Sequence, residues 1–209
     1  MTLSTSTRKK LVIAWLVLLS SGIAVIFWRY QWKYGLPTPV PVNYHDVSRG
    51  AVIRFPPSAQ ALLHPGSKPL FLHFFNPDCP CSRFNMPQFK ALVQKYGRRV
   101  DFSIVIMGPK TFTAAALQDK FNLPYPIPVL QDSAVAAACG VYSTPQAVLI
   151  DREGRLFFRG NYNRSRYCSD EKTGFARQAI DGLLDSNYSL TFSPLALKAY
   201  GCTLPTCNQ

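Results

Sequence analysis

The chain has 209 residues, of which 47% are hydrophobic and 16% are charged, and this balance excludes a mostly disordered protein. The length predicts one folded domain with its own core and room for appended segments. Basic residues outnumber acidic ones by 23 to 11, but five of the 23 lie among the first 33 residues, where no acidic residue occurs. The rest of the chain is only moderately basic and shows no nucleic-acid-binding module, so we expect no nucleic-acid partner.

The first apolar segment, residues 11–28, reads LVIAWLVLLSSGIAVIFW and contains no charged residue. As a helix it would be about 27 Å long, which matches the hydrocarbon core of a bilayer. A basic cluster at positions 8–10 precedes it and, by the positive-inside rule, places residues 1–10 in the cytoplasm. We therefore expect a single-pass membrane anchor. A cleaved signal peptide is the alternative, although bulky Phe27 and Trp28 stand where cleavage would fall.

Residues 29–67 are expected to form a proline-rich spacer and an N-terminal extension. PTPVPV at 37–42 predicts an extended, semi-rigid stretch. Further along, Ala51–Phe55 has the composition of a short strand. Pro57–Leu63 has that of a short helix with proline in its first turn.

Strand-like and helix-like segments then alternate over residues 68–190. We expect strands at Leu70–Phe75, Val100–Met107, Val129–Leu130, Ala147–Ile150 and Leu156–Arg159, and helices at Cys81–Tyr96, Thr113–Phe121, Ser133–Cys139 and Lys172–Leu184. This order implies an α/β domain, a mixed β-sheet flanked by helices. Residues 191–209 are expected to form a cysteine-containing tail.

Six cysteines lie beyond the apolar segment, which suits an oxidising, exported compartment. They are Cys79, Cys81, Cys139, Cys168, Cys202 and Cys207. An even number permits three disulfides without requiring them, and the possible full pairings number about 15. No Cys-x-x-Cys pair occurs, which argues against a zinc finger or ribbon.

The segment 74–82, FFNPDCPCS, leads a strand through a proline-containing turn into a helix. Cys79 falls at the start of that helix, where unbonded amides and the positive end of the helix dipole favour thiolate over thiol. The thiolate is the nucleophile in disulfide exchange. Asp78 opposes this effect, and Arg83 is a candidate to offset it.

A second feature, Ser143-Thr144-Pro145, comes just before the strand AVLID. A proline that leads into a buried strand is poorly suited to ordinary ladder geometry. A cis peptide bond before Pro145 would place the backbone of Thr144 beside the Cys79 turn. We therefore expect these two features to meet in space.

Together, FFNPDCPCS and the later TPQAVLIDREGRLFFRG resemble the thioredoxin-like superfamily. Within it they are most similar to membrane-tethered redoxins of the alkyl-hydroperoxide-reductase/thiol-specific-antioxidant class. The resemblance covers about residues 68–184 and implies a thioredoxin-like fold. It implies that Cys79 is the attacking cysteine, that Pro145 is the cis-proline lining the substrate groove, and that Thr144 holds the partner chain by backbone contacts.

The sequence departs from that pattern in its motif, CPCS. Thioredoxins carry Trp-Cys-x-x-Cys, whereas Asp78 replaces the tryptophan, Ser82 stands at the second cysteine and Cys81 comes one position early. A Cys-x-Cys disulfide closes a small, strained ring and is easily reduced. Asn76 stands where the peroxiredoxin signature has Thr or Ser, so we expect exchange chemistry rather than peroxidase activity.

The remaining cysteines leave several alternatives open. Cys81 and Cys139 are the candidates to resolve a mixed disulfide on Cys79, unless an external thiol does so. A buried core cysteine is the ordinary alternative for Cys139. The short spacing of Cys202 and Cys207 favours a local structural disulfide between them, and Cys168 has no obvious partner.

The function predicted from the sequence is thiol-disulfide exchange by a membrane-tethered oxidoreductase. Its domain would lie in the periplasm, attached to the inner (cell) membrane, and would act on thiol- or disulfide-bearing proteins or small molecules. No organic cofactor is implied, because the electrons travel on sulfur, and no metal site is expected. A non-catalytic binding or assembly factor is one alternative. A copper chaperone is another, because thiolates suit Cu(I), but His45, His64 and His73 all precede the helix that follows Cys79.

Overall fold

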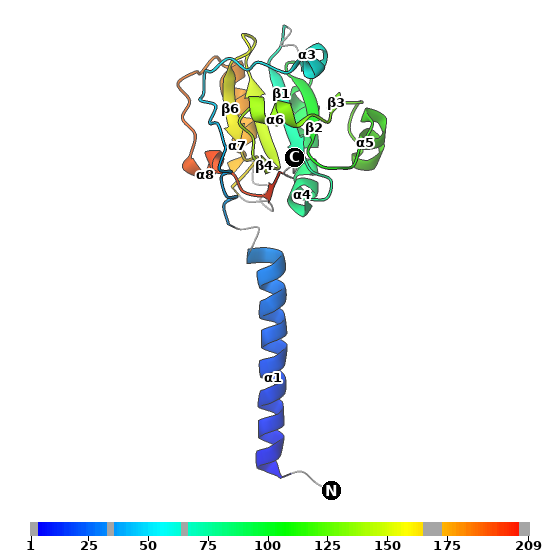
Figure 1. Ribbon diagram of the computed structural model, residues 1–209, viewed down its shortest axis with the longest axis vertical. Coiled ribbons are helices and arrows are strands. Elements are labelled where there is room, and N and C mark those ends of the chain that lie inside the picture. The colour runs from blue at the N-terminus through cyan, green and yellow to red at the C-terminus, as the bar shows by residue number, and fades with distance from the viewer. Residues whose placement is uncertain (1–3, 33–35, 64–66, 165–172, 205–209) are drawn as a thin grey trace. The chain divides into compact units, whose positions relative to one another are not determined.

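The computed structural model describes residues 4–32, 36–63, 67–164 and 173–204. The chain divides into two compact units, Met1–Leu36 and Pro37–Gln209. Figure 1 gives the order of the helices and strands along the chain.

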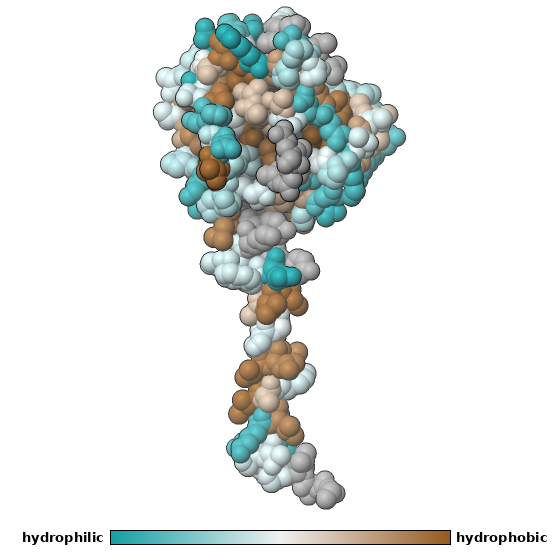
Figure 2. All heavy atoms as spheres, viewed as in Figure 1, coloured by the Kyte–Doolittle hydropathy of each residue, from teal (hydrophilic) through white to brown (hydrophobic). Residues whose placement is uncertain are grey.

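The first unit contains the helix α1 (Thr5–Phe27), followed by the π-helical turn η1 (Trp28–Trp32). The hydroxyl of Ser4 caps α1 by accepting a hydrogen bond from the N–H of Thr7 at 3.2 Å. No residue of α1 is buried, and Figure 2 shows hydrophobic residues along the helix. By length and composition α1 is able to cross a membrane, a property that signal sequences share.

The second unit is built on a five-stranded sheet with the order β3-β2-β1-β5-β6. Its strands are β1 (Leu70–Phe75), β2 (Asp101–Ile106), β3 (Val129–Leu130), β5 (Gln146–Ile150) and β6 (Leu156–Gly160). β1, β2 and β3 are parallel, whereas β5 is antiparallel to β1 and β6 is antiparallel to β5. Every residue of β1 and β5 is buried, as expected for central strands covered on both faces. The predicted α/β class with a mixed sheet is confirmed.

Helices cover both faces of this sheet (Figure 1). They are α3 (Pro57–Leu63), α4 (Pro80–Tyr96), α5 (Ala114–Phe121), α6 (Ser133–Ala138), α7 (Phe175–Leu184) and α8 (Pro194–Leu197). One hydrophobic cluster joins the face of β1 that carries Phe71 and Phe75 to α4 and α7. The opposite face, with Leu72 and Phe74, packs on α6 and on Ile53 of the N-terminal extension.

α4 is the helix that begins at the Cys79 turn. Its buried residues Phe89, Val93 and Tyr96 recur at helical spacing and face the sheet. Pro80 occupies the first turn, where the helix needs no N–H donor, and Gly97 is the C-cap residue at its end. Because β1 and α4 are both anchored in the core, the turn between them is held at a fixed place.

Three short elements differ from the sequence-based expectation. β4 (Ser143–Thr144) and β7 (Cys202–Thr203) form a separate two-stranded sheet, and α8 was not predicted. Conversely, the strand expected at Ala51–Phe55 is reduced to an isolated bridge between Val52 and Arg155. A single bridge gives no repeating ladder, so this segment packs on the sheet without extending it.

Candidate functional site

The turn between β1 and α4 holds Cys79 at the start of a helix. Cys79 is the N-cap residue of α4, and its N–H donates to the carbonyl oxygen of Asn76 at 3.1 Å. The N–H of Asn76 donates in turn to the hydroxyl of Ser82 at 3.2 Å. Ser82, which stands where thioredoxins have their second cysteine, is buried, so its hydroxyl helps to close the turn.

The electrostatic surroundings of Cys79 favour a thiolate. The amides of the first turn of α4 give that end a partial positive charge, and no acidic residue lies in the turn. The carboxylate of Asp78, just before Cys79, is paired with the ammonium group of Lys110. Arg83 was the candidate for this compensation from the sequence, whereas the structure pairs Asp78 with Lys110, from the loop after β2. The pair is exposed, so it weakens the opposing charge without cancelling it.

The segment before β5 brings a backbone carbonyl to the sulfur of Cys79. The Thr144–Pro145 peptide bond is cis, and Cys79 Sγ lies 3.7 Å from the carbonyl oxygen of Thr144. Ser143 and Thr144, which form β4, are fully buried. The meeting of the Cys79 turn with Thr144 that the sequence predicted is therefore present.

β7 brings a second cysteine to the same place. It pairs antiparallel with β4, so that Cys202 lies opposite Thr144. Cys202 forms a disulfide with Cys79, with a Cα–Cα distance of 6.2 Å and a sequence separation of 123. The expected local disulfide between Cys202 and Cys207 is wrong for this state of the chain, because strand pairing holds Cys202 against Cys79. Cys207 itself lies outside the described residues.

Cys81 completes a group of three sulfur atoms. The Sγ atoms of Cys79, Cys81 and Cys202 all lie within 4.8 Å of one another. Cys79 and Cys81 are each 2% exposed, whereas Cys202 is half-buried. Cys81 keeps its thiol while the other two are bridged. A disulfide and a third sulfur are thus brought within reach of one another.

Cys139, one of the predicted resolving residues, lies in the core. It follows α6 and belongs to the hydrophobic cluster that contains Leu72 and Phe74. Burial raises the pKa of its thiol to about 12, so the thiol stays protonated and is a poor nucleophile at neutral pH. This position fits the structural role that was the alternative for Cys139. Cys168 and the first residue of the helix predicted at 172–184 lie outside the described residues.

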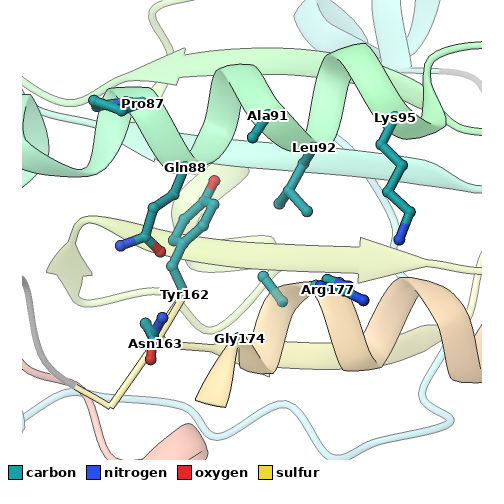
Figure 3. Close-up of a pocket in the computed structure, with 10 residues that line it drawn as sticks. Pro87, Gln88, Ala91, Leu92, Lys95, Tyr162, Asn163, Gly174 and Arg177 are labelled. Atoms are coloured by element: carbon teal, nitrogen blue, oxygen red, sulfur yellow. The ribbon is translucent and has the colours of Figure 1, made fainter. Parts of the chain in front are cut away.

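A pocket of about 510 Å³ lies between α4 and α7 (Figure 3). Leu92 and Lys95 extend into it from α4, Arg177 lies on the side of α7, and Tyr162 lines it as well. None of the three clustered cysteines is among its lining residues. The sulfur group is therefore a separate feature, formed by a helix N-terminus and a short strand pair.

A family model described as a domain of unknown function, DUF6436, matches residues 54–207. The chain belongs to this family. The DUF6436 match includes the Cys79 turn, β4 and β7, and therefore all three clustered cysteines. No curated protein was found to match the chain.

Solved structures resemble this DUF6436 protein at low sequence identity. A hypothetical protein of Sinorhizobium meliloti is 20% identical, with a TM-score of 0.58 over 77% of this chain and 96% of its own. An uncharacterized conserved protein of Geobacillus kaustophilus is 17% identical, with a TM-score of 0.61 over 82% and 100%. A secreted disulfide oxidoreductase of Mycobacterium tuberculosis is 19% identical, with a TM-score of 0.40 over 60% of this chain and 85% of its own. The two likenesses with TM-scores above 0.5 concern the fold alone, a mixed sheet flanked by helices.

The pairing of Cys202 with Cys79 was not predicted from the sequence. The signal that could have indicated it is Gly201, the residue before Cys202, because glycine permits another backbone to approach closely. That signal is weak by itself, since glycine is common in turns and its partner segment lies more than fifty residues away.

Proposed function

We propose that this protein is a thiol–disulfide oxidoreductase in which Cys79 and Cys202 form the redox-active pair. The observation that carries the proposal is the disulfide between Cys79, at the N-terminus of α4, and Cys202, on a strand paired with Thr144. A sulfur at a helix N-terminus is a good attacking group as a thiolate and a good leaving group when its disulfide is cleaved. The sequence resemblance to membrane-tethered redoxins supports the same activity and requires no cofactor beyond sulfur.

The reaction is an exchange of one disulfide for another. In one direction, a substrate dithiol gives two electrons and two protons to the Cys79–Cys202 bridge and leaves as a disulfide. In the other direction, the thiols of Cys79 and Cys202 reduce a substrate disulfide. Each direction passes through a mixed disulfide on the protein. Thiol- or disulfide-bearing proteins and small molecules are both chemically competent substrates.

The N-terminal helix supports a membrane-bound setting for this chemistry. α1 is 23 residues long and apolar enough to cross a bilayer core. The basic cluster at positions 8–10 lies in its first half and favours a cytoplasmic N-terminus. Residues 37–209 would then lie in the periplasm, an oxidising compartment in which a disulfide persists.

Peptide mapping of the full-length chain tests the redox pair. The protein is purified in detergent without reductant, alkylated and digested, and it should yield a peptide in which Cys79 is linked to Cys202. Glutathione buffers of increasing reducing power should open this bridge in the folded protein, because Cys202 is half-buried rather than enclosed. Addition of oxidised glutathione should close it again.

A Cys139→Ala variant is the control for this mapping and should give the same linked peptide, since Cys139 lies in the core. Two results would contradict the proposal. One is a chain in which Cys202 is linked to Cys207 while Cys79 is a thiol. The other is a Cys79–Cys202 bridge that opens only in denaturant.

The three clustered sulfur atoms favour a second candidate function, the binding of a thiophilic metal ion such as Cu(I). Three thiolates from Cys79, Cys81 and Cys202 would be a soft ligand set of the kind that selects Cu(I). The bridge must first be reduced, because a disulfide sulfur is not a thiolate ligand. Among the residues that the structure describes, no histidine belongs to this cluster, so its ligands would all be sulfur.

A competition experiment tests this second function. The full-length chain, reduced and desalted under anaerobic conditions, should take a single Cu(I) ion from the chelator bicinchoninate. Cys81→Ser should weaken this binding by about tenfold or more, as expected when a ligand is lost. Cys139→Ala should leave it unchanged. If the reduced chain fails to compete, or if Cys81→Ser binds equally well, Cu(I) binding at this cluster is excluded and the exchange function is unaffected.

A further inference from the structure

β7 lies where a substrate segment would have to lie in order to reach Cys79. Its Cys202 is opposite Thr144 in the antiparallel pair, and the carbonyl oxygen of Thr144 is 3.7 Å from Cys79 Sγ. A strand adds to a sheet edge through main-chain hydrogen bonds, which do not depend on the identity of the side chains. A cysteine on another polypeptide would therefore reach Cys79 by the same pairing.

Gly201 makes this close approach possible. A Cβ atom at position 201 would lie 2.1 Å from the carbonyl oxygen of Thr144 and 2.9 Å from its carbonyl carbon. These are backbone atoms, which cannot move aside as a flexible side chain can. Gly201 also has a φ of +147°, which L residues rarely adopt. A strand that docks as β7 does therefore needs glycine immediately before its cysteine.

The segment that carries β7 is anchored as far as Tyr200. The carbonyl oxygen of the fully buried Ala199 accepts a hydrogen bond from the N–H of Thr38 at 2.9 Å, and Tyr200 forms an antiparallel bridge with Pro37. The side-chain amide of Asn161 donates to the carbonyl oxygens of Leu195 and Lys198 at 2.8 and 2.6 Å, which fixes α8. Beyond Tyr200, β7 pairs with β4 over two residues. The hydroxyl of Thr38 donates to the carbonyl oxygen of Gly201 at 3.3 Å, and the N–H of Leu204 donates to that of Tyr142 at 3.4 Å. So short a strand pair is marginal alone. Reduction of the disulfide would therefore let β7 leave while α8 stays in place.

The two bridged sulfurs differ in accessibility. Cys79 is 2% exposed and Cys202 is half-buried, so an external thiolate reaches Cys202 more readily. Attack on Cys202 releases Cys79 as a thiolate at the helix N-terminus that stabilises it. The second thiol of the external dithiol then attacks the sulfur bonded to Cys202 and releases Cys202. The dithiol leaves as a disulfide, and the protein has gained two electrons and two protons.

We propose, on the basis of the oxidoreductase function above, that β7 is an intramolecular mimic of the substrate, paired with β4 where a substrate strand would bind. The protein then reduces disulfides in extended polypeptide segments. In the oxidised protein β7 occupies the Ser143–Thr144 edge, so a substrate strand binds there only after reduction. Because only the reduced protein binds a substrate strand, the protein acts as a reductase.

The reaction then proceeds in two steps. The Cys79 thiolate attacks the substrate disulfide, so that one substrate sulfur leaves as a thiol and the other stays bonded to Cys79. β7 returns, the thiolate of Cys202 attacks Cys79 Sγ, and the second substrate sulfur leaves as a thiol while the returning strand displaces the product. The two electrons and two protons of the Cys79 and Cys202 thiols have passed to the substrate.

Three chromogenic disulfides test the proposal on the reduced, full-length Cys202→Ser chain in detergent. Each carries 2-nitro-5-thiobenzoate as its leaving group, attached to the cysteine of the peptide KAYGCTL (residues 198–204), to that of KAYACTL, or to glutathione. The rate of reaction at Cys79 is the rate of chromophore release minus that of the Cys79→Ser/Cys202→Ser double variant. KAYGCTL should react about tenfold faster than the other two, which is the advantage that one or two main-chain hydrogen bonds provide.

A second variant tests whether β7 competes for the same edge. Adding Gly201→Ala to Cys202→Ser should raise the rate with KAYGCTL several-fold, because β7 no longer docks. Gly22→Ala, at a position where a Cβ meets nothing within 4 Å, is the control and should leave the rate unchanged.

The outcomes separate this proposal from the one on which it rests. Equal rates for the three disulfides would overturn strand binding but leave the exchange chemistry intact. No reaction at Cys79 with any of them would overturn the oxidoreductase function. Wild-type chains joined to each other by a disulfide between Cys79 and Cys202 would show that β7 docks on a second copy. That result would overturn its role as an intramolecular mimic of the substrate.

Discussion

Replacing Cys79 by serine is expected to lower the rate of catalysed disulfide exchange by about a hundredfold or more, to the background rate of the assay thiol. The serine hydroxyl is not ionised at neutral pH, whereas the N-terminus of α4 favours the thiolate at this position. The measurement uses the full-length chain in detergent. It follows the reduction of a disulfide-linked fluorescent peptide by glutathione, with and without the protein.

Cys139→Ala is the matched control for this substitution. Cys139 is fully buried and its pKa is raised to about 12, so the variant should keep the wild-type rate. Cys202→Ser should differ from both, because it keeps the nucleophile and loses its partner. It should accumulate a mixed disulfide on Cys79 that mass spectrometry detects. An unchanged rate for Cys79→Ser would show that another cysteine attacks the substrate.

Local sequence patterns predicted the central strands and helices of the fold. They also predicted two features of the site, the Cys79 turn and the Thr144–Pro145 bond. The run LFLHFF predicted β1 because its six residues are buried on both faces of the sheet. The helix expected at Thr113–Phe121 is α5, and the hydroxyl of Thr113 caps it by accepting a hydrogen bond from the N–H of Ala116. The Cys79 turn and the Thr144–Pro145 bond met as predicted, since both adjoin strands whose pairing in the sheet leaves little freedom.

The pairing of Cys202 with Cys79 depends on contacts that local sequence patterns do not encode. β4 and β7 are two residues long, too short for a period of alternating hydrophobicity to be visible. Spacing therefore favoured the nearest cysteine, Cys207, as the partner of Cys202. The bridge to Cys79 instead depends on α8, which returns the chain across β6, and on a glycine that lets two backbones approach. The compensation of Asp78 by Lys110 escaped prediction for the same reason, because it links two loops that are distant in the sequence.

The core of the domain contains a second group whose chemistry can be tested, the imidazole of His73. It is fully buried in β1, stacked on the ring of Phe89 with a centroid distance of 4.5 Å. Its Nδ1 lies 2.6 Å from the hydroxyl of Tyr162, and its Nε2 has no hydrogen-bond partner among the described residues. A charged imidazole is strongly disfavoured in such surroundings. Burial accordingly lowers the pKa of His73 from 6.5 to about 3.

This lowered pKa predicts that acid destabilises the fold through His73. Above pH 6.5 the residue is neutral in both the folded and the unfolded chain and has no effect. Between pH 6.5 and about 3 the unfolded chain binds a proton that the folded chain excludes, so the free energy of unfolding falls as the pH falls. The slope approaches about 1.4 kcal/mol per pH unit, and the loss reaches about 2 kcal/mol by pH 5.

A comparison of wild type with His73→Phe tests this loss. The free energy of unfolding of each full-length chain is measured by denaturant titration between pH 7.5 and 5. Phenylalanine keeps the ring that packs on Phe89 and cannot bind a proton. Its stability at pH 7.5 is lower, since the hydroxyl of Tyr162 loses its partner, but its pH dependence should be shallower than that of the wild type by the amount given above. His45→Gln, at an exposed position, should retain the wild-type slope. If wild type and His73→Phe lose stability in parallel, the folded chain binds a proton at His73, and the imidazole is not enclosed as the structure has it.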